Sequence, residues 1–153
     1  MPTTFTQKAA RVFGLGRMPA ERRAQMESEG QMLYLAEGIA ETAILRGFKA
    51  PGARCAYRRM LLVGFFALSE RRLVARAKCF HKIDIDTTFD DPKFRRLEFR
   101  ATPHYLSLMF DPSSYLPDAS GRVEIRLHLP DVRKAAELLE AKGACLAAEP
   151  AAK

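Results

Sequence analysis

The order of apolar and polar positions predicts a chain built mainly from short strands. An apolar run, Leu62 to Leu68, is followed by a polar turn, Ser69 to Arg71, and then by alternating residue types. Successive side chains of a strand point to opposite faces, so Leu73 and Ala75 should share one face and Arg72 the other. Two antiparallel strands joined by a turn are therefore expected, and they need further strands or a helix for stability.

The same pattern continues on both sides of this hairpin and predicts about seven strands. The expected strands are Ile39 to Lys49, Arg54 to Leu68, Arg71 to Lys78, His81 to Asp86, Arg96 to Ala101, Tyr105 to Phe110 and Arg122 to Leu129. In the last strand, strict alternation predicts that Glu124 and Arg126 are exposed. The residues expected to be buried there are Val123, Ile125, Leu127 and Leu129.

Two helices are expected at either end of the strands. Good helix formers run from Pro19 to about Leu35, with Gly30 as an alternative earlier end. After Pro130 the apolar period becomes helical, and Lys142-Gly143 is typical of a helix C-terminus. The apolar stripe of this second helix consists of Val132, Ala135, Ala136 and Leu139.

The predicted fold is mainly β with a terminal helix. Antiparallel strands of this number form a sandwich or a partly open barrel, and a helix with one apolar stripe suits the uncovered end. We expect residues 1–37 to be a basic N-terminal tail with a lead-in helix. Residues 38–143 should be the barrel domain with its helix, and residues 144–153 a disordered tail.

Composition places the chain among globular proteins of a reducing compartment. It has 153 residues, of which 48% are hydrophobic, and three cysteines without a C-x-x-C pair. The longest apolar run, Met60 to Leu68, is about half the length that a membrane span requires. The N-terminus lacks the apolar core of a secretory signal, so we expect a cytoplasmic protein, with peripheral membrane contact as an alternative.

The hairpin motif resembles a known family. Leu68-Ser69-Glu70-Arg71-Arg72-Leu73 is similar to the L-T-[D/N]-x-R-L hairpin of bacterial pleckstrin-homology-like (PH-like) and GRAM-like domains. In that family an apolar strand with glycine precedes the motif, as Val63 to Phe66 does here, and a final strand runs into a helix. The resemblance covers roughly Gly38 to Gly143. It implies a PH-like barrel in a bacterial protein, acting as a binding module.

Basic residues are the strongest indication of a binding site. Lys and Arg number 25 against 18 acids, a net charge of +7, which favours anionic partners or simply a well-solvated surface. The candidate ligand-binding residues cluster around the first two hairpins: Lys49, Arg54, Arg58, Arg59, Arg71 and Arg72. PH-like domains that bind phosphoinositides use cations in this region. Arg58 and Arg59 are adjacent, however, and should point to opposite faces.

No motif predicts catalysis, a metal or a cofactor. The three histidines, His81, His104 and His128, have no metal-ligand spacing, and Asp84 and Asp86 lack the pattern of a calcium loop. Serine-nucleophile motifs and phosphate-binding glycine loops are absent from the sequence.

Three hypotheses of function remain. The first is a non-catalytic module for protein–protein association or self-assembly through exposed sheet edges. The second is binding of an acidic lipid surface or another anionic ligand through the basic hairpins. The third is a small enzyme with an unrecognised pocket. Nucleic acid is disfavoured, because the sequence offers no aromatic stacking platform.

Overall fold

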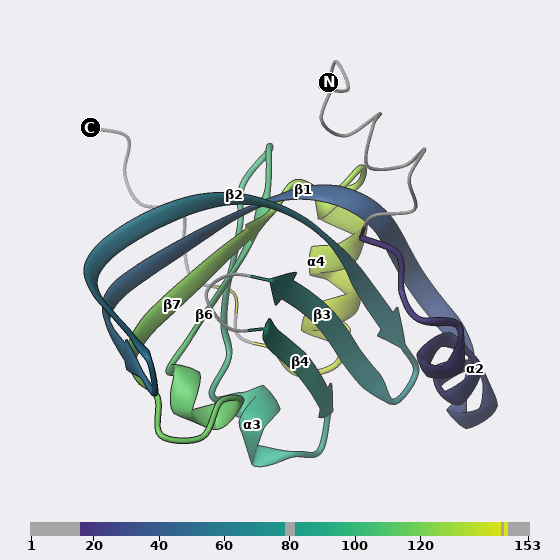
Figure 1. Ribbon diagram of the computed structural model, residues 1–153. Helices are drawn as coiled ribbons and strands as arrows, with labels where there is room; N and C mark the ends of the chain where they lie inside the picture. Colours follow the sequence, from purple (N-terminus) through teal and green to yellow (C-terminus); the bar gives the residue numbers. More distant parts are fainter. Residues whose placement is uncertain (1–15, 79–81, 145, 147–153) are drawn as a thin grey trace.

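The computed structural model describes residues 16–78, 82–144 and 146. Within them a single sheet is flanked by short helices (Figure 1). The elements are α2 (Ala20–Glu29), β1 (Met32–Ala50), β2 (Ala53–Ser69), β3 (Arg72–Lys78), β4 (Lys82–Thr88), α3 (Pro92–Arg95), β5 (Glu98–Ala101), β6 (Leu106–Phe110), the 3-10 turn η1 (Pro112–Ser114), β7 (Ser120–Leu127) and α4 (Val132–Ala141). The expected mainly β fold with a helix near the C-terminus is confirmed.

The seven strands form one antiparallel sheet in the order β4-β3-β2-β1-β7-β6-β5. The sheet curls into a half-barrel (Figure 1). Strands β1 and β2 connect the two sides of the sheet, and with 19 and 17 residues they are its longest strands. At one end β2 pairs with β3, and further along β1 pairs with β7.

Strand β1 begins earlier than the sequence pattern predicts. We expected a helix from Pro19 to about Leu35 and a strand from Ile39, but α2 ends at Glu29 and β1 starts at Met32. Gly30 follows the helix in an extended conformation, which ends the helix. Gly38, with φ of 62°, lies at an irregularity within β1 rather than at its start. The segment after Gly30 is strand because it pairs with the end of β2.

The main core lies on the concave face of the sheet. Phe66, Leu106 and Leu127 are fully buried there and come from three different strands. Phe94 of α3 and Leu139 of α4 belong to the same cluster. Helix α4 packs against β5 and β6 and therefore helps to cover the concave side.

The apolar stripe of α4 is confirmed. Val132, Ala135, Ala136 and Leu139 are all buried. Asp131 accepts a hydrogen bond from the Lys134 amide at the start of the helix, and Gly143 follows its end with φ of 90°. A left-handed glycine after the last turn is a common helix stop.

A second, smaller core lies on the convex face beneath α2. It joins Met18 and Met26 to Phe65, Ala67 and Val74. Met26 is the residue of α2 that is fully buried, so this short helix is held by few apolar contacts.

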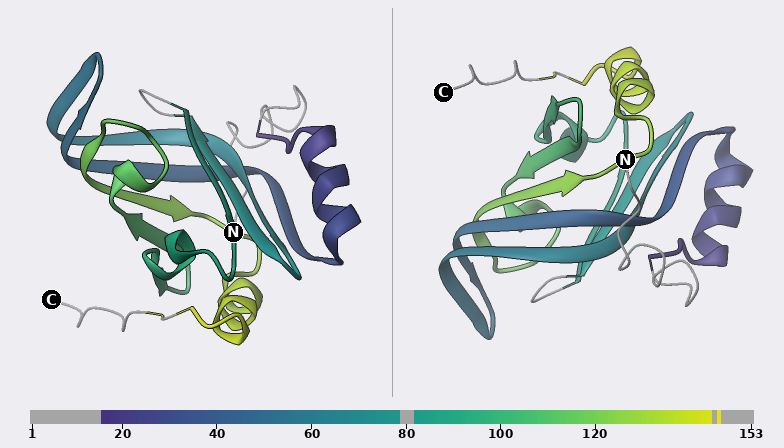
Figure 2. Two further views of the ribbon diagram at one scale, coloured as in Figure 1. Left: turned by 90° about the horizontal axis from the view of Figure 1, so that it is seen from below. Right: turned by 90° about the horizontal axis from the view of Figure 1, so that it is seen from above.

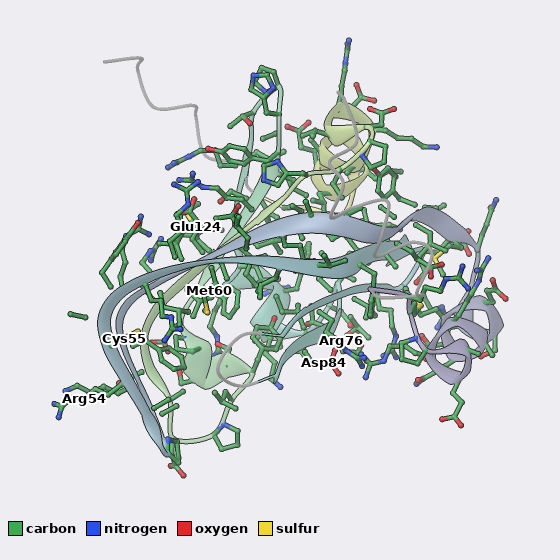
Figure 3. All side chains as sticks on the ribbon, turned by 45° about the horizontal axis from the view of Figure 1, so that its top comes forward. Arg54, Cys55, Met60, Arg76, Asp84 and Glu124 are labelled. Carbon is green, nitrogen blue, oxygen red and sulfur yellow. The ribbon has the colours of Figure 1, made fainter. Side chains whose placement is uncertain are left out.

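Ion pairs at the rim of this second core fasten α2 to the sheet. The Arg72 guanidinium donates to both oxygens of Glu29 in α2 and to Asp86 of β4. Arg22 of α2 donates to Asp84 over 2.6 Å, and Arg76 approaches Asp84 as well (Figure 3). Arg72, a candidate ligand-binding residue in the sequence, is thus held in a structural network of ion pairs.

The turn between β2 and β3 is closed by its serine. The Ser69 hydroxyl oxygen accepts hydrogen bonds from the amides of Arg71 and Arg72. Serine readily bonds the backbone of a turn in this way.

Candidate anion-binding face

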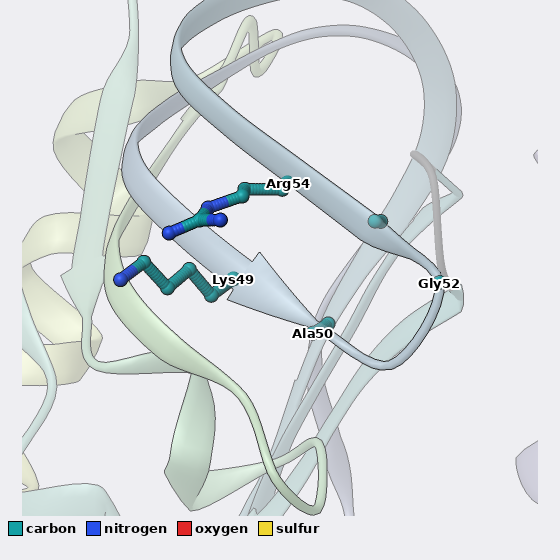
Figure 4. A pocket seen from close by; sticks show the side chains of 5 residues that line it. Lys49, Ala50, Gly52 and Arg54 are labelled. Atoms are coloured by element: carbon teal, nitrogen blue, oxygen red, sulfur yellow. The ribbon is translucent and has the colours of Figure 1, made fainter.

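The structure separates the six basic residues selected from the sequence into two groups. Lys49 and Arg54 are paired across the tip of the β1–β2 hairpin and line a shallow hollow there (Figure 4). Arg58 and Arg59 follow on β2. The other two candidates, Arg71 and Arg72, lie at the opposite end of β2, beside the turn to β3.

Only the first group can serve as a common site. Arg72 is 16% exposed and held by Glu29 and Asp86, so it is not available to a ligand. Arg71 is exposed but lies next to this structural network. By contrast, Lys49, Arg54 and Arg59 have no carboxylate partner among the described residues.

Beyond Glu41, the hairpin that carries the first group contains basic residues and no acidic ones. From Thr42 to Ser69 the chain contains five cations and no Asp or Glu. The distal part of this hairpin projects beyond the remainder of the sheet (Figure 2). An acid-free, projecting segment produces a positive field into which an anionic group can enter.

Further arginines on the convex face add to this positive field, and they were not predicted from the sequence. Residues directly opposite one another on paired strands share a face. Arg59 of β2 lies opposite Ile44 of β1, which in turn lies opposite Glu124 of β7. Two residues further along β2, Leu61 lies opposite Thr42 of β1, which lies opposite Arg126 of β7. The arginines that this register gathers on the convex face are Arg46, Arg59, Arg100, Arg122 and Arg126, hereafter the arginine face.

Glu124 lies at the centre of the arginine face and corrects a prediction. It was expected to be exposed, but it is 4% exposed on the convex side (Figure 3). Its carboxylate accepts hydrogen bonds from Ser107, Arg126 and Arg46. Arg126, also expected to be exposed, is half-buried. The inward residues Val123, Ile125, Leu127 and Leu129 are buried as predicted.

The surroundings of Glu124 and His128 on this face shift the pKa of both side chains. Burial alone would raise the pKa of Glu124, but hydrogen bonds from Ser107, Arg126 and Arg46 and the charge of Arg126 outweigh it, so the pKa is lowered. The pKa of His128 is lowered too, first by burial and then by the charges of Arg126 and Arg59. Glu124 thus stays ionised and orients its arginines, while His128 stays neutral.

Two large apolar side chains stand exposed on β2 beside Arg59. Tyr57 is 61% and Leu61 is 82% exposed, and both share the convex face with Arg59. Isolated exposed apolar residues are ordinary, but these flank an unpaired arginine on a projecting strand. The combination of apolar and cationic groups is typical of interaction surfaces.

The outer edge of β2 is unpaired next to these residues. Pairing of β2 with β3 starts at Phe65 and extends to Leu68, and among the described residues no strand pairs with that edge from Ala53 to Gly64. Unpaired strand edges are templates for further pairing. An arginine face, exposed apolar residues and an open edge therefore meet on the distal half of the hairpin.

Other candidate chemistry is accounted for within the described residues. They contain no cluster of three or more side chains able to hold a metal ion, and Asp84 and Asp86 are engaged by arginines. His104 lies in an exposed loop, and His81 lies outside the described residues. None of the helices in the described ranges has the length and apolar character needed to cross a membrane.

The described part of the chain is thus a curled antiparallel half-barrel that carries a basic hairpin. No protein-family model, curated protein or solved structure matches the chain.

Proposed function

We propose that the protein is a non-catalytic interaction module that associates with an acidic protein partner through the distal half of its β1–β2 hairpin. A PH-like identity is part of this proposal. The Ser69 turn and the passage from β7 into α4 support it. The proposed setting is the cytoplasm of a bacterium, in keeping with an odd number of cysteines.

One observation carries the proposal: a projecting hairpin holds five cations and no acid between Thr42 and Ser69. Elsewhere the described arginines are mostly neutralised, as Arg22, Arg72 and Arg76 are by Asp84, Asp86 and Glu29. Lys49, Arg54 and Arg59 differ from these arginines, because they have no carboxylate partner in the described part of the chain. Unpaired guanidinium groups favour carboxylates, which they can bind through two parallel hydrogen bonds.

The same charge pattern argues against self-assembly through β2. If two copies paired along their β2 edges, each register would bring cations against cations or neutral residues, because the strand has no acid. Like charges directly opposite one another destabilise a strand pair. The partner should therefore be a different, acidic surface.

An acidic membrane is the second candidate, favoured by Leu61 and Tyr57 beside basic residues. A protein partner explains more of the hairpin. If Leu61 entered the lipid, the unpaired backbone groups of the β2 edge would follow it. Each unsatisfied backbone group in the hydrocarbon region costs several kcal/mol, so the open edge opposes insertion.

The test is binding of labelled polyglutamate, followed by fluorescence anisotropy, to the full chain and two charge-reversal variants. Arg54→Glu with Arg59→Glu removes unpaired cations of the hairpin. The matched control, Arg133→Glu with Lys134→Glu, makes the same change in net charge on exposed residues of α4. We expect the hairpin variant to bind at least about ten-fold more weakly and the control to bind like the parent.

Two results would contradict the proposal. Equal weakening by both variants would mean that polyglutamate responds to net charge alone. Sedimentation with phosphatidylserine vesicles at low salt provides the other comparison. Vesicle binding that depends on Arg54 and Arg59, without polyglutamate binding, would assign the hairpin to a lipid surface.

A further inference from the structure

We infer that the acidic partner contributes an extended segment that adds as a further strand to the outer edge of β2 between Arg54 and Leu62. This rests on the proposed function and gives it a geometry. The segment should carry an acidic residue with apolar residues two positions before and after it. The inference combines the free backbone groups of the edge with the order of side chains along β2.

Backbone hydrogen bonds next to the paired strands fix which backbone groups of β2 are free. The His128 amide donates to the Ala40 carbonyl, so Ala40 and every second residue after it in β1 point their N–H and C=O groups toward β7. The residues between them, Glu41, Ala43 and Leu45, therefore bond their partners Leu62, Met60 and Arg58 in β2. The residues of this part of β2 whose backbone groups point away from β1 are thus Tyr57, Arg59 and Leu61.

These outward groups are accessible in a continuous row. Tyr57, Arg59 and Leu61 are all exposed residues. Since β3 pairs with β2 from Phe65 onward, an added strand would extend the sheet on the side of β3 without displacing it. Its main-chain hydrogen bonds would supply affinity and its alternate side chains specificity.

The side chains of β2 specify the pattern of the added strand. Tyr57, Arg59 and Leu61 alternate along the convex face, with 61% of Tyr57 and 82% of Leu61 exposed. Directly opposite residues on neighbouring strands share a face and contact each other. A carboxylate opposite Arg59 would pair with its charge, and apolar residues opposite Tyr57 and Leu61 would pack against these two side chains.

The other two sheet edges fit an acidic segment less well. Strand β4 carries Asp84 and Asp86 on the convex face, and their charges are already bound by Arg22, Arg72 and Arg76. A further carboxylate beside Asp84 and Asp86 would meet arginines that are already paired. At the opposite edge of the sheet, Phe99 of β5 forms a parallel bridge with Leu146. The edge of β2 therefore combines free backbone groups with unpaired positive charge.

A synthetic peptide with the core Leu-Thr-Glu-Thr-Leu is the probe. A second peptide of the same sequence carries N-methyl groups on alternate amides, which removes edge hydrogen bonds and leaves its charge unchanged. A third replaces Glu with Lys. Fluorescence anisotropy with the full chain measures all three. We expect the methylated and the Lys peptides to bind at least about ten-fold more weakly than the parent peptide.

The protein-side variant is Leu61→Pro, which deletes one outward N–H without changing charge, and Leu61→Ala is its matched control for the loss of the side chain. Proline is tolerated on an edge strand when its nitrogen faces away from the partner strand. We expect the melting temperature to change little and peptide binding to fall about ten-fold. The methylated peptide repeats the test on unaltered protein, so a folding defect in Leu61→Pro leaves a decisive measurement.

The outcomes separate the two proposals. If methylated and parent peptides bind equally, strand addition is wrong, whereas the acidic partner stands. The same holds if polyglutamate binds and the Leu-Thr-Glu-Thr-Leu peptide does not. If neither acidic probe binds, both proposals are wrong.

Discussion

The Glu41 carboxyl group lies against the α-carbon of Gly64 on the concave face of the sheet. A Cβ at position 64 would overlap Glu41 Oε1 and the backbone oxygen of Arg76, so glycine leaves the space that the carboxyl group occupies. Glu41 is 1% exposed, and both of its carboxyl oxygens are buried without a hydrogen-bond partner. Burial therefore raises its pKa well above the ordinary value.

The first prediction is that Glu41→Gln stabilises the protein at high pH. An acid whose folded pKa is raised destabilises the fold as pH rises, because the unfolded chain releases its proton first. The penalty is absent below the ordinary pKa of glutamate and is complete above the raised pKa. The free energy of unfolding of Glu41→Gln should exceed that of the parent at about pH 8, and the gain should diminish toward about pH 4. A gain independent of pH would contradict this.

The second prediction is that Gly64→Ala destabilises the protein. Forcing a methyl group against Glu41 and the Arg76 carbonyl should cost about 1–3 kcal/mol in denaturant unfolding. The Glu41→Ala background supplies the control, since it removes one of the two overlapping groups. The cost of Gly64→Ala should be smaller there. Equal costs in both backgrounds would show that the carboxyl group does not occupy this space.

The third prediction concerns the fastening of α2. Arg72→Met removes three hydrogen bonds to Glu29 and Asp86 and leaves carboxylates without their partner. We expect a loss of about 1–3 kcal/mol in the free energy of unfolding. Arg71→Met, an exposed neighbour, should change it by less than about 0.5 kcal/mol. If both variants unfold alike, the ion pairs do not hold the helix.

The same network has a pH dependence of its own. Burial would raise the pKa of Asp84, but hydrogen bonding by Arg22 and the charges of Arg22 and Arg76 outweigh it and lower the pKa. An acid with a lowered folded pKa stabilises the fold above its ordinary pKa, and this stability is lost as pH falls through the lowered value. Asp84→Asn should therefore reduce the free energy of unfolding at neutral pH and less so below about pH 3. An unchanged difference across this range would contradict the assignment.

The fifth prediction is that Leu139→Ala destabilises the protein by about 2–5 kcal/mol. Leu139 is fully buried in the main core, to which α4 brings its apolar stripe. Leu138→Ala, a partly buried neighbour on the same helix, should cost less. Thermal unfolding measures both, and equal losses would mean that the stripe does not define the buried side of α4.

The sequence predicted those parts of the fold that depend on neighbouring residues. Alternation alone identified the inward residues of β7, and the Ser69 turn closes through bonds two and three residues away. The start of β1 was missed, because residues after Gly30 become strand only through pairing with the distant end of β2. Local periodicity carries no information on such pairing.

The candidate site was predicted in part for the same reason. Lys49, Arg54, Arg58 and Arg59 are close in sequence and lie on one hairpin. Burial of Glu124 depends on Arg46, 78 positions away, and on Ser107, 17 positions away. Only the register of β1, β7 and β6 brings these residues together, so the arginine face could not be predicted without it.

Amide chemical-shift mapping of the full chain during titration with polyglutamate tests the central claim most directly. We expect the shifts to concentrate on β2 from Arg54 to Leu62 and on β1 from Arg46 to Lys49, and to vanish at high salt, which screens exposed charges. Shifts centred on α4, or on Arg71 and the adjoining end of β2, would contradict it.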